Sequence, residues 1–364
     1  MKGGVLPFLV CPICKSALHL TRFVSDKDWT EEGILDCAKG DRFPIIRGIP
    51  VLIEPVLRKD VLGREEIIFW EKYPDTRPAS AACRLAAPAE SRHAKKSAAE
   101  VWGYQWQHFH QVWQEKAGEE QFYRWVQPLR PEDLQGKIIL DAGCGTGRHV
   151  RYSAQHAKAV IGIDLSFATR VAERLSHELP NAHIVQADIY RLPFLQETFD
   201  RIFSLGVLHH LPDPKGAYLG LIPYAKKSGS LTAWLYGREN NWFAACGLEI
   251  IRKLITRRLP LPCLRALALI PSILLRWVIQ FIYVPLNSIA PALAAKLPYN
   301  TFFMLFYRLS FRNLWIMVFD QLDAPIANYY RREVMEDWLR SSELKGTCLS
   351  QTNDISWTIH GVRS

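Results

Sequence analysis

The chain has 364 residues, of which 49% are hydrophobic, so it can form a full α/β domain with additions and is not a largely disordered protein. Its eight cysteines are scattered, which excludes a disulfide framework and favours a reducing compartment such as the cytoplasm. The net charge is +9, and residues 236–315 supply +8 of it, with ten Lys and Arg against two Glu, so the basic character belongs to one segment.

The first 56 residues predict a small module of short strands and tight turns. Its ending, Arg42-Phe-Pro-Ile-Ile-Arg-Gly-Ile-Pro-Val-Leu52, resembles zinc-ribbon-like modules that activate methyltransferases or are fused to them. Three cysteines could hold zinc: Cys11, Cys14 and Cys37. Zinc needs four ligands, and Gly40 stands where a fourth cysteine would be, although His19 or Asp41 could substitute. We therefore expect a metal-free fold and assign no metal ligand, with zinc as the alternative.

Residues 74–100 are rich in Ala and Pro and predict a flexible linker. An aromatic block follows, with one helical face at the spacing of Trp102, Trp106, Phe109 and Trp113. This helix could pack on a sheet, or it could form a lid with Tyr104 and Trp106 beside a bound cofactor. Both interpretations stay open.

A glycine-rich loop is the most informative segment. An apolar run ends in Asp141, and glycines follow at alternate positions, Gly143, Gly145 and Gly147. The pattern predicts a buried strand that turns into a helix, with backbone N–H groups free to approach a nucleotide or nucleoside. A dinucleotide-binding loop would have a further glycine where Arg148 stands, and the Gly-Lys-Ser/Thr of a phosphate-binding loop is absent.

Three more apolar runs follow at helix-length separations, and each ends in a polar residue, Asp164, Asp188 or Ser204. This succession predicts an α/β fold with a doubly wound parallel sheet. An acid at the end of the second strand is placed to accept both ribose hydroxyls of a nucleoside.

These strands and the loop Leu208-His-His-Leu-Pro-Asp213 resemble class I S-adenosylmethionine-dependent methyltransferases over residues 135–236, and more weakly from Asp320 onward. The resemblance implies a seven-stranded Rossmann-like sheet, with Asp141 near the methionine amino group, Asp164 at the ribose and Asp188 at the adenine. The candidate cofactor-binding residues are Asp141, Gly143, Gly145, Gly147, Asp164, Leu165, Asp188, Ile189, Ser204, Tyr104 and Trp106.

Two histidines follow the fourth strand, at the side of the transferring methyl group. The unperturbed pKa of histidine, about 6.5, suits a general base at neutral pH. We take His210 as the first candidate for the catalytic base and His209 as the second. The alternative is that both only pack or shape the loop.

Residues 240–314 form an insertion after the fifth strand, and residues 315–364 predict a closing helix and an antiparallel hairpin. Arg276 separates two apolar runs, and prolines at 271, 285 and 291 should break them, so we expect no membrane span. The insertion could be buried against the core, could cap an apolar acceptor pocket, or could lie on an anionic membrane surface. In the last case its basic cluster, Arg252, Lys253, Arg257 and Arg258, should be needed for membrane binding.

The sequence therefore predicts a cytoplasmic S-adenosylmethionine-dependent methyltransferase that acts on a small or lipid-like acceptor in a biosynthetic pathway, with peripheral membrane contact left open. One alternative is an RNA methyltransferase, suggested by the basic insertion and the zinc-ribbon-like module. The basic residues alternate with aliphatic runs, unlike a phosphate-binding face, so we do not expect a nucleic-acid partner. A non-catalytic cofactor-binding scaffold is a further alternative, although it would not need every acid and glycine.

Overall fold

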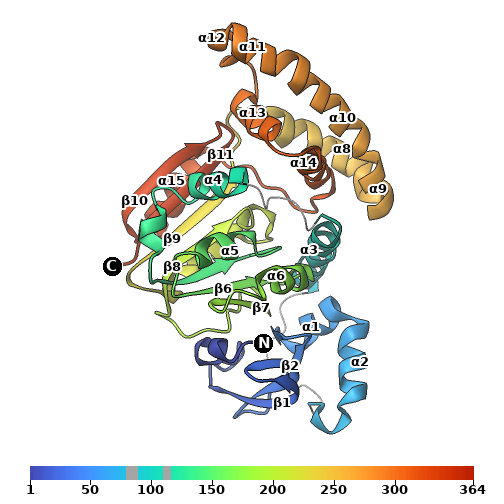
Figure 1. Ribbon diagram of the computed structural model, residues 1–364, viewed down its shortest axis with the longest axis vertical. Helices are drawn as coiled ribbons and strands as arrows, with labels where there is room; N and C mark the ends of the chain where they lie inside the picture. The colour runs from blue at the N-terminus through green and yellow to red at the C-terminus, as the bar shows by residue number, and fades with distance from the viewer. Residues whose placement is uncertain (79–88, 110–115) are drawn as a thin grey trace.

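The computed structural model describes residues 1–78, 89–109 and 116–364. Within these residues one sheet of eleven strands has the order β1-β2-β3-β4-β7-β6-β5-β8-β9-β11-β10 (Figure 1). The strands are β1 (Leu18–Asp26), β2 (Trp29–Cys37), β3 (Arg42–Ile46), β4 (Ile49–Leu52), β5 (Ile138–Ala142), β6 (Ala159–Asp164), β7 (Ala182–Ala187), β8 (Phe199–Leu205), β9 (Ala225–Tyr236), β10 (Lys345–Thr352) and β11 (Ser356–Val362).

The central part of this sheet confirms the predicted fold. Strands β7, β6, β5, β8 and β9 run parallel, and β11 and β10 close the edge as an antiparallel hairpin, which gives the seven strands expected. Successive residues of β5 enter different apolar cores, Ile139 one and Leu140 the other, so both faces of the sheet are covered. The covering helices are α4 (Lys116–Trp125), α5 (Arg148–Ala154), α6 (Ala168–Ser176), α7 (Pro214–Leu221) and α15 (Arg332–Ser341).

The N-terminal module continues the central sheet instead of standing apart. β4 pairs in parallel with β7, with Val51 opposite Gln186 and Leu52 opposite Ala187. Two helices follow the module, α1 (Pro55–Leu62) and α2 (Arg64–Lys72). The module's own side chains, among them Cys11 and Phe43, belong to the same apolar core as Leu140. Module and domain therefore share one hydrophobic core.

The segment predicted as a linker contains the start of a long helix. Helix α3 (Ala89–His108) begins well before residue 100, which corrects the C-terminal boundary of the linker. Residues 79–88 of the predicted linker and Trp113 of the aromatic face lie outside the described residues. In Figure 1, α3 lies between the sheet and the helical insertion, the position of a lid.

The insertion is a helical layer beyond α3 (Figure 1). Its helices are α8 (Leu248–Leu254), α9 (Leu261–Leu267), α10 (Leu269–Val278), α11 (Val284–Ile289), α12 (Pro291–Ala294) and α13 (Asn300–Arg308), and α14 (Phe311–Asp323) leads back to the domain.

Pro271 and Pro285 do not break the helix as we predicted, because one helical stretch runs from Leu261 to Ile289, whereas Pro291 does follow a break at Ala290. Pro271 and Pro285 each fall in the first turn of a helical segment, where a missing N–H is tolerated, and a π-helical turn (Ile279–Tyr283) precedes the second. By length and composition alone this stretch could cross a membrane: its mean hydropathy reaches 1.9, and 22% of its most apolar window is buried. Our argument against a membrane span assumed that the prolines interrupt the helix, and that assumption was wrong for Pro271 and Pro285.

Candidate active site

One cavity of about 790 Å³ connects the carboxyl ends of the central strands with the helical insertion. Its strand side is lined by the loops after β5, β6, β7 and β8, which is where doubly wound sheets place their ligands. Helix α3 forms one wall, and the insertion forms the far end. The predicted residues that line it are Gly143, Gly145, Asp164, Leu165, Asp188, Ile189, Trp106 and His210.

The glycine loop after β5 has the conformation that the sequence predicted. Gly143 and Gly145 have φ of +95° and +51°, in the region that side chains rarely adopt. A Cβ on Gly143 would lie 2.3 Å from a methyl carbon of Val207, and one on Gly145 would lie 3.3 Å from Nε1 of Trp106. Gly147 precedes the first residue of α5 and does not line the cavity. The first two glycines therefore leave room in the cleft, and the third serves the turn.

Asp141 lies beneath this loop and is 1% exposed. Neither of its carboxylate oxygens has a hydrogen-bond partner in the described part of the chain. Burial raises the pKa of Asp141 to about 7, although the positive charge of Arg148 opposes the shift. An unpaired buried carboxylate is unfavourable unless a ligand completes it. Asp141 does not line the cavity, so the contact with a methionine ammonium group that the resemblance implies stays a prediction.

Asp164, at the end of β6, accepts hydrogen bonds from the loop after β5 and from the loop after β6. Its Oδ2 accepts a hydrogen bond from Gly145 N at 3.0 Å, and its Oδ1 accepts from Ser166 N at 2.8 Å and Ser166 Oγ at 2.7 Å. Burial raises the pKa of Asp164, and these hydrogen bonds oppose the rise. The carboxylate lines the cavity at the strand end where a ribose is expected.

Asp188 has a partner that the sequence did not reveal. Lys95 of α3 donates to its Oδ2 at 2.6 Å, and the Lys95 ammonium lies 4.5 Å from the centre of the Tyr190 ring. The side chains of this pair are 8% and 6% exposed. Lys95 fell inside the predicted linker. The signal that could have found it is the helical spacing of Lys95, Trp102 and Trp106, which all line the cavity.

The aromatic residues of α3 divide between the cavity and the insertion, and the lid stays a prediction. Trp106 lines the cavity as expected, but Tyr104 stacks on His108 at 4.0 Å and packs towards the insertion, away from the cavity lining. Trp102, which was not predicted as a site residue, lines the cavity, and its ring centre lies 4.5 Å from that of His210. Ser204 donates to the carbonyl oxygen of Ala142 at 3.0 Å and serves the sheet rather than the cavity surface.

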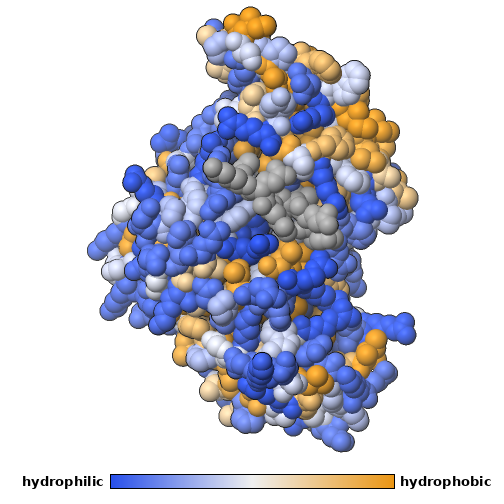
Figure 2. Space-filling model, viewed as in Figure 1, coloured by the Kyte–Doolittle hydropathy of each residue, from blue (hydrophilic) through white to orange (hydrophobic). Residues whose placement is uncertain are grey.

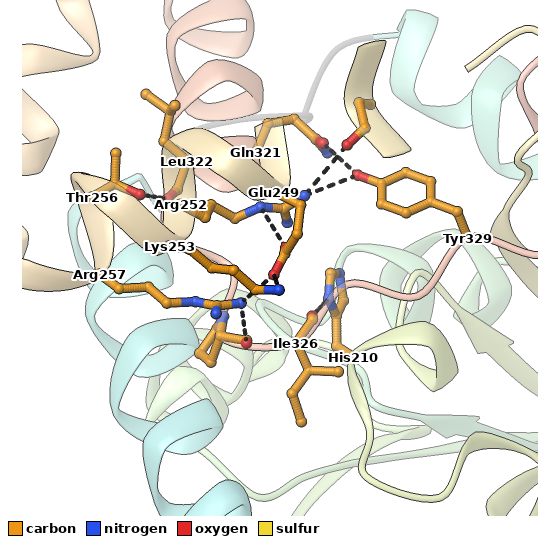
Figure 3. Close-up of polar contacts among 12 residues, drawn as sticks. His210, Glu249, Arg252, Lys253, Thr256, Arg257, Gln321, Leu322, Ile326 and Tyr329 are labelled. Atoms are coloured by element: carbon orange, nitrogen blue, oxygen red, sulfur yellow. Dashed lines mark hydrogen bonds and ion pairs between the residues drawn. The ribbon is translucent and has the colours of Figure 1, made fainter. Parts of the chain in front are cut away.

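The two histidines have different environments. His210 lines the cavity, and its Nδ1 lies 2.6 Å from the carbonyl oxygen of Ile326, which can only accept (Figure 3). Nδ1 is therefore the donor, and Nε2 keeps a lone pair. Burial lowers the pKa of His210, so the ring stays neutral at pH 7. His209 is fully buried behind it and stacks on Tyr236 at 3.8 Å. The geometry suits His210 as a base and His209 as support for the loop.

A chain of half-buried polar groups lines the cavity, and it ends at the buried Arg252 of the insertion. Tyr236 donates to Asp320 Oδ2 at 3.1 Å, and Gln321 Nε2 donates to the Tyr236 oxygen at 3.1 Å. Tyr329 donates to Gln321 Oε1 at 3.1 Å, and Arg252 donates to the Tyr329 oxygen at 3.4 Å (Figure 3). Burial raises the pKa of both tyrosines, so both keep their protons. Both line the cavity.

Beyond this polar chain the cavity is apolar. Its lining there comes from α8, α9, α10, α13 and α14, and it includes Ile251, Leu275, Phe302, Phe306 and Ile316. Within the described residues the insertion therefore contributes a hydrophobic wall to the same cavity that holds the predicted cofactor site.

A second cluster lies in the N-terminal module. One ligand atom from each of Cys11, Cys14, Cys37 and Asp41 lies within 4.8 Å of all the others. Cys14 Sγ and Cys37 Sγ are 3.7 Å apart, and Asp41 Oδ2 lies 3.6 Å from Cys11 Sγ and 3.5 Å from Cys37 Sγ. A tetrahedral zinc with ordinary bond lengths needs edges of about 3.8 Å between sulfurs and about 3.5 Å between sulfur and oxygen. The donor set fits zinc, with Asp41 in the place of the missing cysteine, while the exposed His19 lies beside Asp36 instead.

Comparison with known proteins finds similarity over the central domain. The methyltransferase domain family matches residues 140–232. The tRNA U34 carboxymethyltransferase of Pseudomonas paraeruginosa is 37% identical over 114 residues, 30% of this chain and 35% of the relative. That of Shewanella oneidensis is 37% identical over 115 residues, 29% of this chain and 34% of the relative. The chain thus spans about a third of the length of the curated relatives it matches.

Solved structures with a similar fold are more distant in sequence. The magnesium protoporphyrin IX methyltransferase of Synechocystis, solved with S-adenosylmethionine, is 14% identical, with a TM-score of 0.43 over 77% of this chain and 100% of that one. The Haloferax volcanii complex that contains the Trm112 methyltransferase activator gives 19% identity and a TM-score of 0.32, over 39% of this chain and 62% of that one. The matched sequence, the sheet order and the site together identify a class I S-adenosylmethionine-dependent methyltransferase domain in this chain.

Proposed function

We propose that this chain transfers the methyl group of S-adenosylmethionine to an acceptor whose apolar portion occupies the insertion side of the cavity. The observation that carries this proposal is the continuity of one cavity, from Asp164 and Asp188 at the strand ends to Leu275 and Phe306 in the insertion. A site of this kind, mostly apolar with a few convergent polar groups, is typical for a small-molecule ligand.

The cofactor supplies an activated methyl group on a sulfonium, so the protein mainly positions the acceptor and removes its proton. Asp141, Asp164 and Asp188 would hold the nucleoside and the methionine portion. His210 Nε2 would accept the proton of the acceptor, since its Nδ1 is occupied by Ile326. Whether an oxygen, nitrogen or carbon atom receives the methyl group is left open by this proposal.

RNA is the second candidate acceptor, and the comparisons favour it, because the curated relatives named above are tRNA U34 carboxymethyltransferases. They give no support to our expectation that nucleic acid is not a partner. Their match covers about a third of each protein. The first candidate is supported by the charge of the lining: no Lys or Arg of residues 240–314 lines the cavity, whereas RNA binding needs basic side chains along the phosphate backbone.

The test is methyl transfer from labelled S-adenosylmethionine to two acceptor pools, a detergent-solubilised lipid extract and total tRNA. We expect label in the organic phase with the wild-type chain and little with the His210→Gln variant, whose cofactor affinity serves as the control. Label in tRNA alone would refute the apolar acceptor and support the second candidate. Cofactor binding without label in either pool would favour a binding scaffold.

A further inference from the structure

The outer side of the long helical stretch Leu261–Ile289 is apolar and exposed. Its exposed side chains recur at spacings of three and four residues, which places them on one face: Leu267, Ile270, Leu274, Trp277, Val278 and Phe281. Trp277 and Phe281 are 64% and 65% exposed. Figure 2 shows hydrophobic residues gathered over the insertion at the upper right of the molecule. A soluble surface helix normally presents its polar side to water, so this helix has the reverse arrangement.

The charge of the insertion indicates what covers this face. Residues 250–319 contain nine Lys and Arg and no Asp or Glu. Exposed examples are Lys253, Arg258, Lys296 and Arg308. An exposed apolar face on a basic insertion is complementary to an anionic membrane surface.

Three residues of the predicted basic cluster have partners within the protein. Arg252 is fully buried and reaches Tyr329, so it cannot meet a membrane, contrary to the sequence expectation (Figure 3). Arg257 donates to Glu249 at 3.1 Å, and Lys253 lies 3.6 Å from the same carboxylate. The net positive charge of the insertion comes from the remaining basic residues, because Glu249 neutralises only part of this cluster.

We propose that the exposed face of Leu261–Ile289 docks on an anionic phospholipid bilayer, with the helix lying along the membrane surface. The opposite side of the helix packs on the protein through Leu264, Ala268 and Ser272, one turn apart. Arg276 donates to the carbonyl oxygen of Tyr307 at 3.3 Å on the protein side. A membrane span would have to detach this side and place Arg276 in hydrocarbon, which is unfavourable. Half-immersion keeps these contacts and covers only the exposed face.

The docked orientation also gives an acceptor a route to the cofactor. Leu267 is 41% exposed on the docking face and also lines the cavity, together with Pro271 and Leu275 of the same stretch. The cavity therefore reaches the face that would meet the bilayer. This step rests on the proposed function, because it assigns the apolar acceptor to the membrane itself.

The test is flotation of the full chain with vesicles of phosphatidylcholine alone or with equal parts of phosphatidylglycerol. We expect binding to the anionic vesicles at low salt, with release by high salt or alkaline carbonate. The double variant W277E/F281E should bind at least tenfold more weakly, because neither residue lines the cavity and both lie on the docking face. The matched control is I67E/I68E on α2, where both side chains are 51% exposed on another surface, and it should bind as the wild type does.

A pair of double variants that remove positive charge tests the electrostatic part of the proposed membrane binding. Lys253→Gln with Arg258→Gln should weaken binding to anionic vesicles only, whereas Lys59→Gln with Arg64→Gln, also exposed, should not. Unchanged flotation of W277E/F281E, no binding of the wild type, or resistance to alkaline carbonate would overturn the proposal. So would a wild-type dimer that W277E/F281E converts to a monomer, since a second copy would then cover the face.

Methyl transfer separates this proposal from the proposed function. W277E/F281E should label acceptors in detergent as the wild type does and fail only with acceptors held in vesicles. Loss of labelling by the wild type in detergent would refute the proposed function and leave the vesicle result standing on its own.

Discussion

The protonation of Asp141 should control cofactor binding. Its pKa is raised to about 7 because the carboxylate is buried without a partner in the described chain. An ammonium group requires the ionised form, so affinity for S-adenosylmethionine should fall about tenfold per pH unit below 7. At pH 5.5 the binding should be about 30-fold weaker than at alkaline pH, a loss of about 2 kcal/mol.

Calorimetric titration between pH 5.5 and 8.5 measures this effect directly. Near pH 6, in two buffers of different ionisation enthalpy, binding should release close to one proton. Asp141→Asn should bind weakly with an affinity that hardly depends on pH. Asp164→Ala is the matched control: it should lose roughly 1.5–3 kcal/mol of binding at every pH and keep the same slope. A wild-type affinity independent of pH would refute the role of Asp141.

The same carboxylate should destabilise the ligand-free protein at alkaline pH. Because its pKa in the folded chain lies above the ordinary value of 3.8, the folded state binds the proton more tightly than the unfolded state. The stability that this provides is present at acidic pH and is lost as pH rises towards and through 7, by up to about 4 kcal/mol. Asp141→Asn should therefore melt at a higher temperature than the wild type at pH 8 and bind the cofactor less well. Equal or lower stability of this variant would contradict the reasoning.

Two further changes test other parts of the molecule. Elemental analysis should find about one zinc per chain in the wild type and much less in Asp41→Ala, because the Asp41 carboxylate completes a tetrahedral donor set. A metal-free wild type would instead confirm the expectation from the sequence. His210→Gln should lower kcat by about 10²–10⁴-fold and leave the cofactor affinity unchanged. At saturating cofactor the wild-type rate should not change between neutral pH and pH 6.5, since burial lowers the pKa of His210. A fall in rate that begins above pH 6.5 would argue against His210 as the base.

The cofactor half of the site could be predicted because its signals are local. Each acid lies at or next to the carboxyl end of its own strand, and the parallel arrangement brings Asp141, Asp164 and Asp188 to one edge of the sheet. Lys95 could not be found this way, because it lies 93 residues before the acid it pairs with, in a segment whose composition resembles a linker. Its position depends on how α3 packs, which no local pattern determines.

For the insertion, the composition predicted the overall character correctly but not the positions of individual residues. A count of prolines predicted broken helices, but Pro271 and Pro285 are harmless where the chain starts a new helical segment. A count of charges assigned Arg252 to the surface, yet it is buried against Tyr329. Composition identified the insertion as apolar and basic. The direction in which each side chain points required the packing.

The orientation of its side chains connects the insertion to the proposed methyl transfer. The inner side of the insertion carries Arg252, which meets the chain of Tyr329 and Gln321, and the outer side carries Trp277 and Phe281. A lid for a soluble substrate would need the inner side alone, and its outer side would be free to be polar. An exposed apolar face with two aromatic residues is typical of an interaction surface, which is why we propose that a partner covers it. A bilayer that also supplies the acceptor would satisfy both sides of the insertion at once.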